Sequence, residues 1–226
     1  EEARDSAERA VAEAVDGYRS AQTAQEQALL ALTAEEESLR LAEKELQSAA
    51  SPEDKAKAQA TARSATEAFA RARKTAFNAP QAVRRADAAR VAAEKSRGAL
   101  EAVLAVEQLE DQGAKESDPI VWAEAARAAM DCQRQQSLAA AIVAELAAQL
   151  AVEQATGAVD GLIAAANDPK DESLKTPLAN AIATLVDTRA KLAAANTQRT
   201  TAESDCDLPP TTDYTPRALE FPRAKV

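Results

Sequence analysis

Two cysteines, Cys132 and Cys206, are the side chains whose type and spacing could do covalent chemistry. They stand too far apart for a CxxC redox motif, and the chain has no histidine and no third cysteine to complete a structural zinc site. Their midpoint falls near residue 169, inside a turn that we expect at about 167–176, so helices folded back around that turn would bring them together. We therefore predict a Cys132–Cys206 disulfide and an oxidising, extracytoplasmic compartment; the alternative is two unrelated buried thiols.

Catalytic chemistry lacks its usual residues in this chain. The absence of histidine removes the commonest general base and the commonest metal ligand together. The sequence contains no GxGxxG, GxxxxGK[ST] or GxSxG motif. Acid pairs such as Glu36 and Glu43 could work as catalytic groups only inside a pocket, and an open helical rod offers none. We therefore expect no enzyme, and no catalytic, metal-binding or cofactor-binding residue.

The charge balance narrows the class of partner. The 226 residues include 27 Lys and Arg against 37 Asp and Glu, which gives a net charge of −10. An acidic chain of this kind is repelled by phosphate backbones and anionic headgroups. We therefore expect no nucleic-acid partner, and the absence of any binding motif predicts no small-molecule substrate.

Composition and proline positions predict an all-α protein. Glycine (5 residues) and aromatic side chains (3%) are rare while alanine is abundant, which favours long helices. Three helix starts are marked by a capping residue followed by a proline that fits the first helical position. These pairs are Ser51-Pro52, Asp118-Pro119 and Thr176-Pro177.

We expect long helices at about 3–49, 53–112, 119–166 and 177–204. Pro80 should kink the second helix or interrupt it briefly. The predicted architecture is an elongated antiparallel bundle of three to four helices, forming one domain over 1–206. An extended or disordered Pro-rich tail is expected over 207–226.

Heptad spacing predicts the faces through which the first and last helices pack as coiled coils. In the first helix the seam is expected at Val11, Val15, Tyr18, Gln22, Gln25, Leu29, Leu32, Glu36, Leu39, Glu43 and Leu46. In the last helix it is expected at Leu178, Ile182, Leu185, Arg189, Leu192 and Asn196.

Two further features allow a functional and a structural interpretation. The middle of the second helix is basic, which fits an anionic partner, or the acidic first helix packed antiparallel with Glu8–Asp16 opposite Arg84–Arg90; we favour the second. Trp122 could anchor a partner at the bundle's end or cap the core there, and again the structural interpretation is preferred.

The chain as a whole resembles a known family. It is rich in alanine and glutamate, lacks histidine, is built of long helices with one predicted disulfide, and leaves them through Asp207-Leu208-Pro209-Pro210-Thr211-Thr212. In these features it is similar to the glutamic acid/alanine-rich surface proteins of African trypanosomes. That family is related in architecture to the variant surface glycoproteins and to the haptoglobin–haemoglobin receptor.

The resemblance implies a non-catalytic coat protein on the extracellular face of a parasite's plasma membrane. It implies a GPI-type lipid anchor, whose signal this sequence does not contain, as the sole membrane contact, and a monomer packed laterally in a protective layer. Two alternatives are a surface receptor of the same architecture that binds a host protein through Trp122, Phe77 or Tyr18, and an intracellular coiled-coil scaffold with reduced cysteines.

Overall fold

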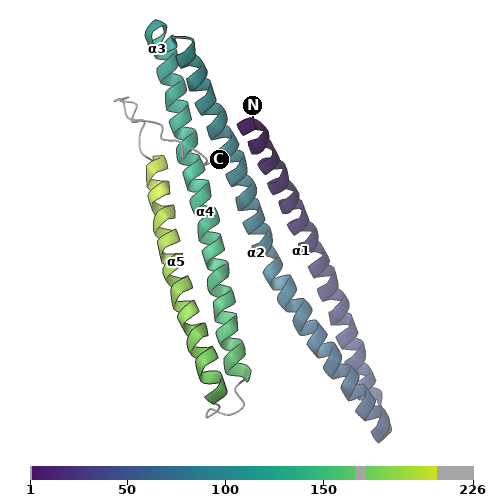
Figure 1. Ribbon diagram of the computed structural model, residues 1–226. Helices are drawn as coiled ribbons and strands as arrows, with labels where there is room; N and C mark the ends of the chain where they lie inside the picture. The colour runs from purple at the N-terminus through teal and green to yellow at the C-terminus, as the bar shows by residue number, and fades with distance from the viewer. Residues whose placement is uncertain (1, 166–171, 208–226) are drawn as a thin grey trace. The chain divides into compact units, whose positions relative to one another are not determined.

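The protein is described here by a computed structural model, which covers residues 2–165 and 172–207 (Figure 1). The described chain is all-α, with helices packed against each other and no strand. Its long helices are α1 (Glu2–Ser48), α2 (Pro52–Asp111), α4 (Pro119–Ala165) and α5 (Lys175–Asp207), joined by the short α3 (Ala114–Ser117) and the 3-10 helix η1 (Glu172–Leu174). The predicted helix starts are confirmed to within two residues. The predicted tail lies outside the described residues apart from Asp207, which ends α5.

Two of the three predicted proline caps form, those before Pro52 and Pro119. The predicted cap at Thr176 is wrong, because α5 begins at Lys175, and Thr176 and Pro177 lie within its first turn. Ser51 caps α2, since its Oγ accepts a hydrogen bond from the backbone N–H of Asp54 at 3.0 Å and donates one to the Asp54 carboxylate at 2.6 Å. Asp118 caps α4 through its Oδ1, which accepts from the N–H of Val121 at 3.3 Å. Each cap supplies a partner to a backbone N–H that has none within the helix, so the chain turns sharply and starts a new helix.

Pro80 lies inside α2, and the helix continues through it. The predicted alternative of an interruption is therefore wrong. A proline within a helix has no N–H for the carbonyl four residues earlier, which here belongs to the buried Ala76.

Replacing Pro80 with alanine should restore that backbone hydrogen bond, because Pro80 is exposed and the new side chain meets no obstacle. We expect the free energy of unfolding to rise by about 1–3 kcal/mol. Urea unfolding followed by circular dichroism measures the change. A matched Ala89→Ser substitution at another exposed α2 position should leave stability within about 0.5 kcal/mol. A less stable P80A protein would show that α2 depends on the proline.

The described helices fall into two compact units that meet within α2. The first unit, Glu2–Ala93, contains α1 and the first part of α2. The second begins at Glu94 and contains the rest of α2 with α3, α4 and α5. The single bundle expected over 1–206 stays a prediction.

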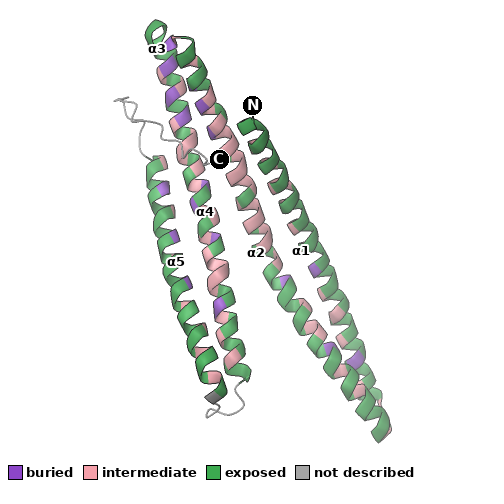
Figure 2. Ribbon diagram, in the orientation of Figure 1, coloured by how far each residue is buried: buried purple, intermediate pink, exposed green. Residues whose placement is uncertain are grey.

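In the first unit the face of α1 toward α2 is a strict heptad stripe, although not quite the predicted one. The partly or fully buried positions alternate in spacing between four and three residues (Figure 2). Among them Leu32 and Leu39 were predicted, whereas Leu29 is 50% exposed and the neighbouring Ala28 is buried in its place. The stripe consists of Ala7, Val11, Ala14, Tyr18, Ala21, Gln25, Ala28, Leu32, Glu35, Leu39, Ala42 and Leu46, with Val15 beside it.

The predicted seam of α1 was therefore wrong at Gln22, Leu29, Glu36 and Glu43, while Val15 lies half-buried at its edge. Gln22, Glu36 and Glu43 are exposed on its flank. Alanine is only weakly hydrophobic, so a search for a heptad pattern assigns the seam position to a larger residue next to it. In packing the opposite holds, because a small side chain lets two helix axes approach to the near end of the usual 8–10 Å.

The same error recurs in α5, which packs against α4. Leu178, Leu185 and Leu192 lie in the seam as predicted. Ile182 is 46% exposed, and Arg189 and Asn196 are exposed too. The small residues before each of them take the inner position: Ala181, Thr188 and Ala195.

Candidate functional sites

The cysteines lie in α4 and in the last turn of α5, half-buried, and both are free thiols in the structure. Asp205 lines the same pocket as Met130 and Gln133, so the end of α5 lies beside the part of α4 that contains Cys132. Cys206 follows Arg199 by one heptad in the seam of α5. On α4, the position two heptads before Glu145, the partner of Arg199, is residue 131. Cys132 comes one residue later and so lies at the edge of this seam. The disulfide stays a prediction. The two cysteines lie at similar positions along the axes of α4 and α5, and forming the bond requires a local shift that brings their Sγ atoms together.

We expect protein isolated from an oxidising compartment to show no free thiol when it is denatured without reductant. The bond would close a loop of roughly 75 residues and stabilise the chain by about 4 kcal/mol, so reduction should lower the melting temperature clearly. A C132S/C206S variant measures the reduced state without reductant. Two reactive thiols in the native, unreduced protein would contradict the prediction and with it the argument for an oxidising compartment.

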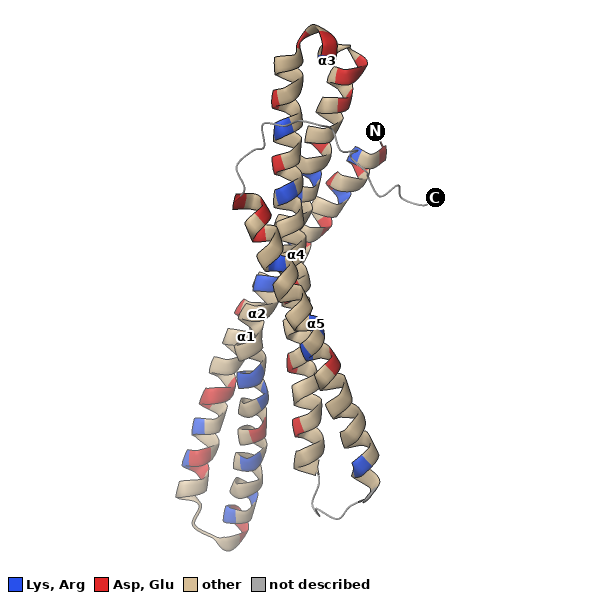
Figure 3. Ribbon diagram, turned by 90° about the vertical axis from the view of Figure 1, so that its left-hand side faces the viewer, with Lys and Arg blue, Asp and Glu red and all other residues tan. Residues whose placement is uncertain are grey.

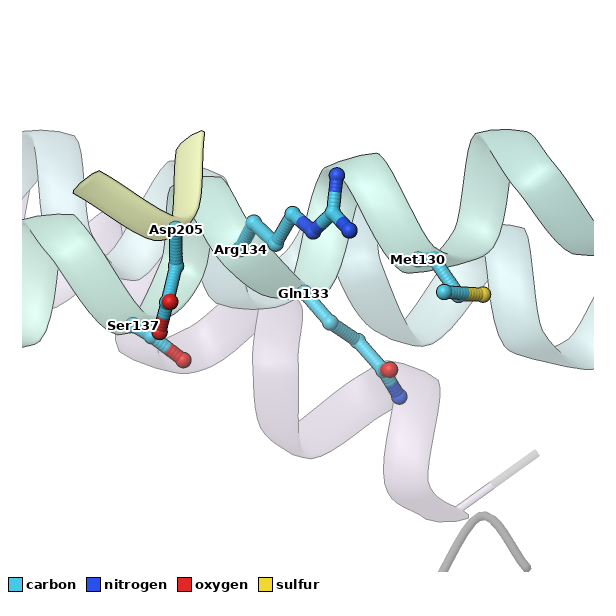
Figure 4. A pocket seen from close by; sticks show the side chains of 5 residues that line it. All are labelled: Met130, Gln133, Arg134, Ser137 and Asp205. Carbon is cyan, nitrogen blue, oxygen red and sulfur yellow. The ribbon is translucent and has the colours of Figure 1, made fainter. Parts of the chain in front are cut away.

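The pocket beside Cys132 is small and offers little for chemistry (Figure 4). Its volume is about 200 Å³, below the several hundred Å³ typical of sites for small organic ligands. Arg134 is held by Asp131 on its own helix, with 3.6 Å between nitrogen and oxygen. The lining residues are Met130, Gln133, Arg134, Ser137 and Asp205. Across the described residues no group of three acidic or cysteine side chains could hold a metal ion.

Trp122 is a core residue at the end of the α2–α4 hairpin. It is 8% exposed and packs in a cluster with Val103 and Val106 of α2 and Ala126 and Ala129 of α4. Its indole Nε1 donates to Glu110 Oε1 at 3.1 Å. The Lys115 ammonium lies 5.0 Å from the ring centre, at cation–π distance. The prediction that this tryptophan packs over the end of the core is confirmed, and its alternative use as a partner anchor stays a prediction.

The α4–α5 interface contains a polar network that the sequence did not indicate. Glu145, whose side chain is 12% exposed, meets Arg199 across the interface at 3.0 Å and accepts from Gln149 at 2.9 Å. Arg199 also contacts Glu203 at 3.3 Å. Because a nearly buried carboxylate needs a partner, this pair fixes the register of the two helices. The only signal in the sequence was Arg199 at a heptad position that leucine occupies elsewhere.

Charges on α1 and α2 pair mainly along each helix. Arg63 contacts Glu67 at 3.4 Å, and Arg90 contacts Asp87 at 2.8 Å while its guanidinium lies over the Tyr18 ring of α1 at 5.5 Å. On α1 the hydrogen bond from Arg40 lowers the pKa of the exposed Glu37 carboxyl. Arg90 thus contacts Tyr18, whereas the predicted register placed Glu8–Asp16 opposite Arg84–Arg90.

Five cations in the basic middle of α2 have no carboxylate within 4.0 Å in the described part of the chain: Arg71, Arg73, Lys74, Arg84 and Arg85. Charge pairing with α1 therefore does not explain them. They recur along the part of α2 that belongs to the first unit (Figure 3).

Among the described helices α4 alone is long and apolar enough to cross a membrane, with a mean hydropathy of 1.4 over 18 residues. Length and composition carry little weight here, because a helix in the core of a soluble protein passes the same test. The ion pair of Glu145 with Arg199 and the contact with α5 give α4 a role inside a helical bundle. Comparison with protein-family models, curated proteins and solved structures finds no match to this chain.

Proposed function

We propose that this chain is a non-catalytic coat protein of a parasite's cell surface, held at the extracellular face of the plasma membrane by a lipid anchor. The observation that carries the proposal is the alanine-lined packing of its helices. Four helices of 33 to 60 residues bury small side chains and expose long charged faces, and α2 alone extends about 90 Å.

Such helices suit a spacer better than a catalyst. The pocket beside Cys132 is small, and no group of three acidic or cysteine side chains among the described residues could hold a metal ion, while a catalytic site needs a shaped, water-excluding cavity. Continuous helices present few extended segments to proteases, which favours a role at an exposed surface. The resemblance to the glutamic acid/alanine-rich surface proteins of African trypanosomes supports the same interpretation.

Surface location is tested on intact cells that express the full-length protein. We expect antibodies to label unpermeabilised cells, and a phospholipase that cleaves GPI anchors to release the label into the medium. A known intracellular protein serves as the control for membrane integrity. Label that appears only after permeabilisation would contradict the coat function and favour the intracellular scaffold.

A further inference from the structure

One face of α2 in the first unit carries a continuous line of hydrogen-bond donors. We name these residues the basic stripe: Arg71, Lys74, Asn78, Gln81 and Arg85. Their spacings of three, four, three and four residues keep them on one face over about 21 Å of helix. The first four are exposed and Arg85 is half-buried.

The basic stripe points away from α1. Ala65 and Ala76 are buried and mark the side of α2 that packs against α1. At about 100° per residue, every stripe residue lies within roughly 40° of the side opposite Ala76. The seam with α1 therefore does not cover the stripe, and its residues from Arg71 to Gln81 are exposed.

Pairing among the described residues does not account for the stripe. Arg71, Lys74 and Arg85 have no carboxylate within 4.0 Å, as stated above, and the nearest acids along α2 are already engaged. Glu67 holds Arg63 at 3.4 Å, and Asp87 holds Arg90 at 2.8 Å. Like charges one turn apart, such as Arg71 and Lys74, destabilise a helix. The stripe is therefore a local line of positive charge on a chain of net charge −10.

We propose that the basic stripe binds a sulfated polysaccharide chain, an extracellular ligand class that rests on the surface location proposed above. The stripe is one side chain wide and straight, which fits a narrow linear polyanion. Guanidinium groups can hold oxyanions through two parallel hydrogen bonds, and the Asn78 and Gln81 amides can donate between them. Phe77, 80% exposed beside the stripe, offers an apolar surface to a sugar ring.

A narrow ligand is favoured over a broad anionic surface. Screening acts over about 8 Å at physiological salt, so a membrane or a nucleic-acid duplex laid on α2 would also feel the carboxylates of neighbouring faces. A single polysaccharide chain touches the stripe and little else. The partner assigned to this surface is therefore a sulfated glycan.

The test is binding of a heparin oligosaccharide of defined length to the full protein at 0.15 M salt, measured by calorimetry. We expect saturable binding that weakens as salt rises, and no binding of the desulfated oligosaccharide. The variant R71Q/K74Q/R85Q should bind at least about tenfold more weakly. The control K57Q/R63Q/K191Q removes the same charge from exposed cations that already have carboxylate partners, and should bind within about twofold of the native protein. Circular dichroism verifies that both variants keep their helices.

Three results would overturn the proposal. The first is no saturable binding by the native protein, and the second is equal loss of affinity in the two variants. The third is tighter binding of phosphatidylserine vesicles or single-stranded DNA than of the oligosaccharide, which would assign the stripe to another polyanion. Surface labelling of intact cells is read separately, so the coat function can stand if the stripe binds no glycan.

Discussion

Replacing Trp122 with alanine is expected to lower the free energy of unfolding by about 3–5 kcal/mol, the largest loss of any single change in this chain. The other buried members of its cluster are valines and alanines, so the indole is the largest side chain buried there. The substitution also removes the hydrogen bond to Glu110 and the cation–π contact with Lys115. Few neighbours are large enough to fill the space left behind.

The Trp122→Ala measurement is made by urea unfolding followed at 222 nm, because the variant has no tryptophan to report by fluorescence. Ile120→Ala is the matched control, since Ile120 lies in the same turn of α4 and is 71% exposed. It should change stability by less than about 0.5 kcal/mol. A Trp122→Ala loss below about 1 kcal/mol would mean that the hairpin end is loosely packed.

The second test compares substitutions at Ala28 and Leu29. We expect the free energy of unfolding to be more sensitive to a change at the smaller residue, Ala28. Ala28→Leu should destabilise the protein by about 1–3 kcal/mol, because three added carbon atoms must fit between two closely spaced helices. Leu29→Ala should change stability by less than about 0.5 kcal/mol, because Leu29 is half-exposed and alanine is a good helix former. The two variants are compared by urea unfolding under the same conditions. The reverse order, with Leu29→Ala the more damaging, would restore the predicted leucine seam.

Much of the backbone could be predicted because local chemistry determines it. Ser51-Pro52 and Asp118-Pro119 mark helix starts through a cap and a missing N–H, and both effects act within one turn. The continuation of α2 through Pro80 could not be read locally. There the packing of alanines on either side, including the buried Ala76, stabilises the helix enough to offset one lost hydrogen bond.

The packing face was harder to predict than the helices. Heptad counting identified Leu32 and Leu39 in α1 but assigned Leu29 to the seam in place of Ala28. Hydrophobicity increases with side-chain size, whereas a short distance between helix axes requires small side chains. The charge pattern misled in a similar way. Opposite charges on two helices suggested pairing across them, whereas Arg63 and Arg90 find carboxylates one turn away on their own helix, at a lower entropic cost.

The central claim is that alanines, rather than the adjacent large residues, form the contact between the helices. Single cysteines placed at 25, 28, 29 and 32 in a C132S/C206S background test it most directly through their rates of reaction with a thiol reagent in the native protein. The account predicts slow labelling at 25, 28 and 32 and labelling at least about tenfold faster at 29. Protection at 29 together with rapid labelling at 28 would contradict it.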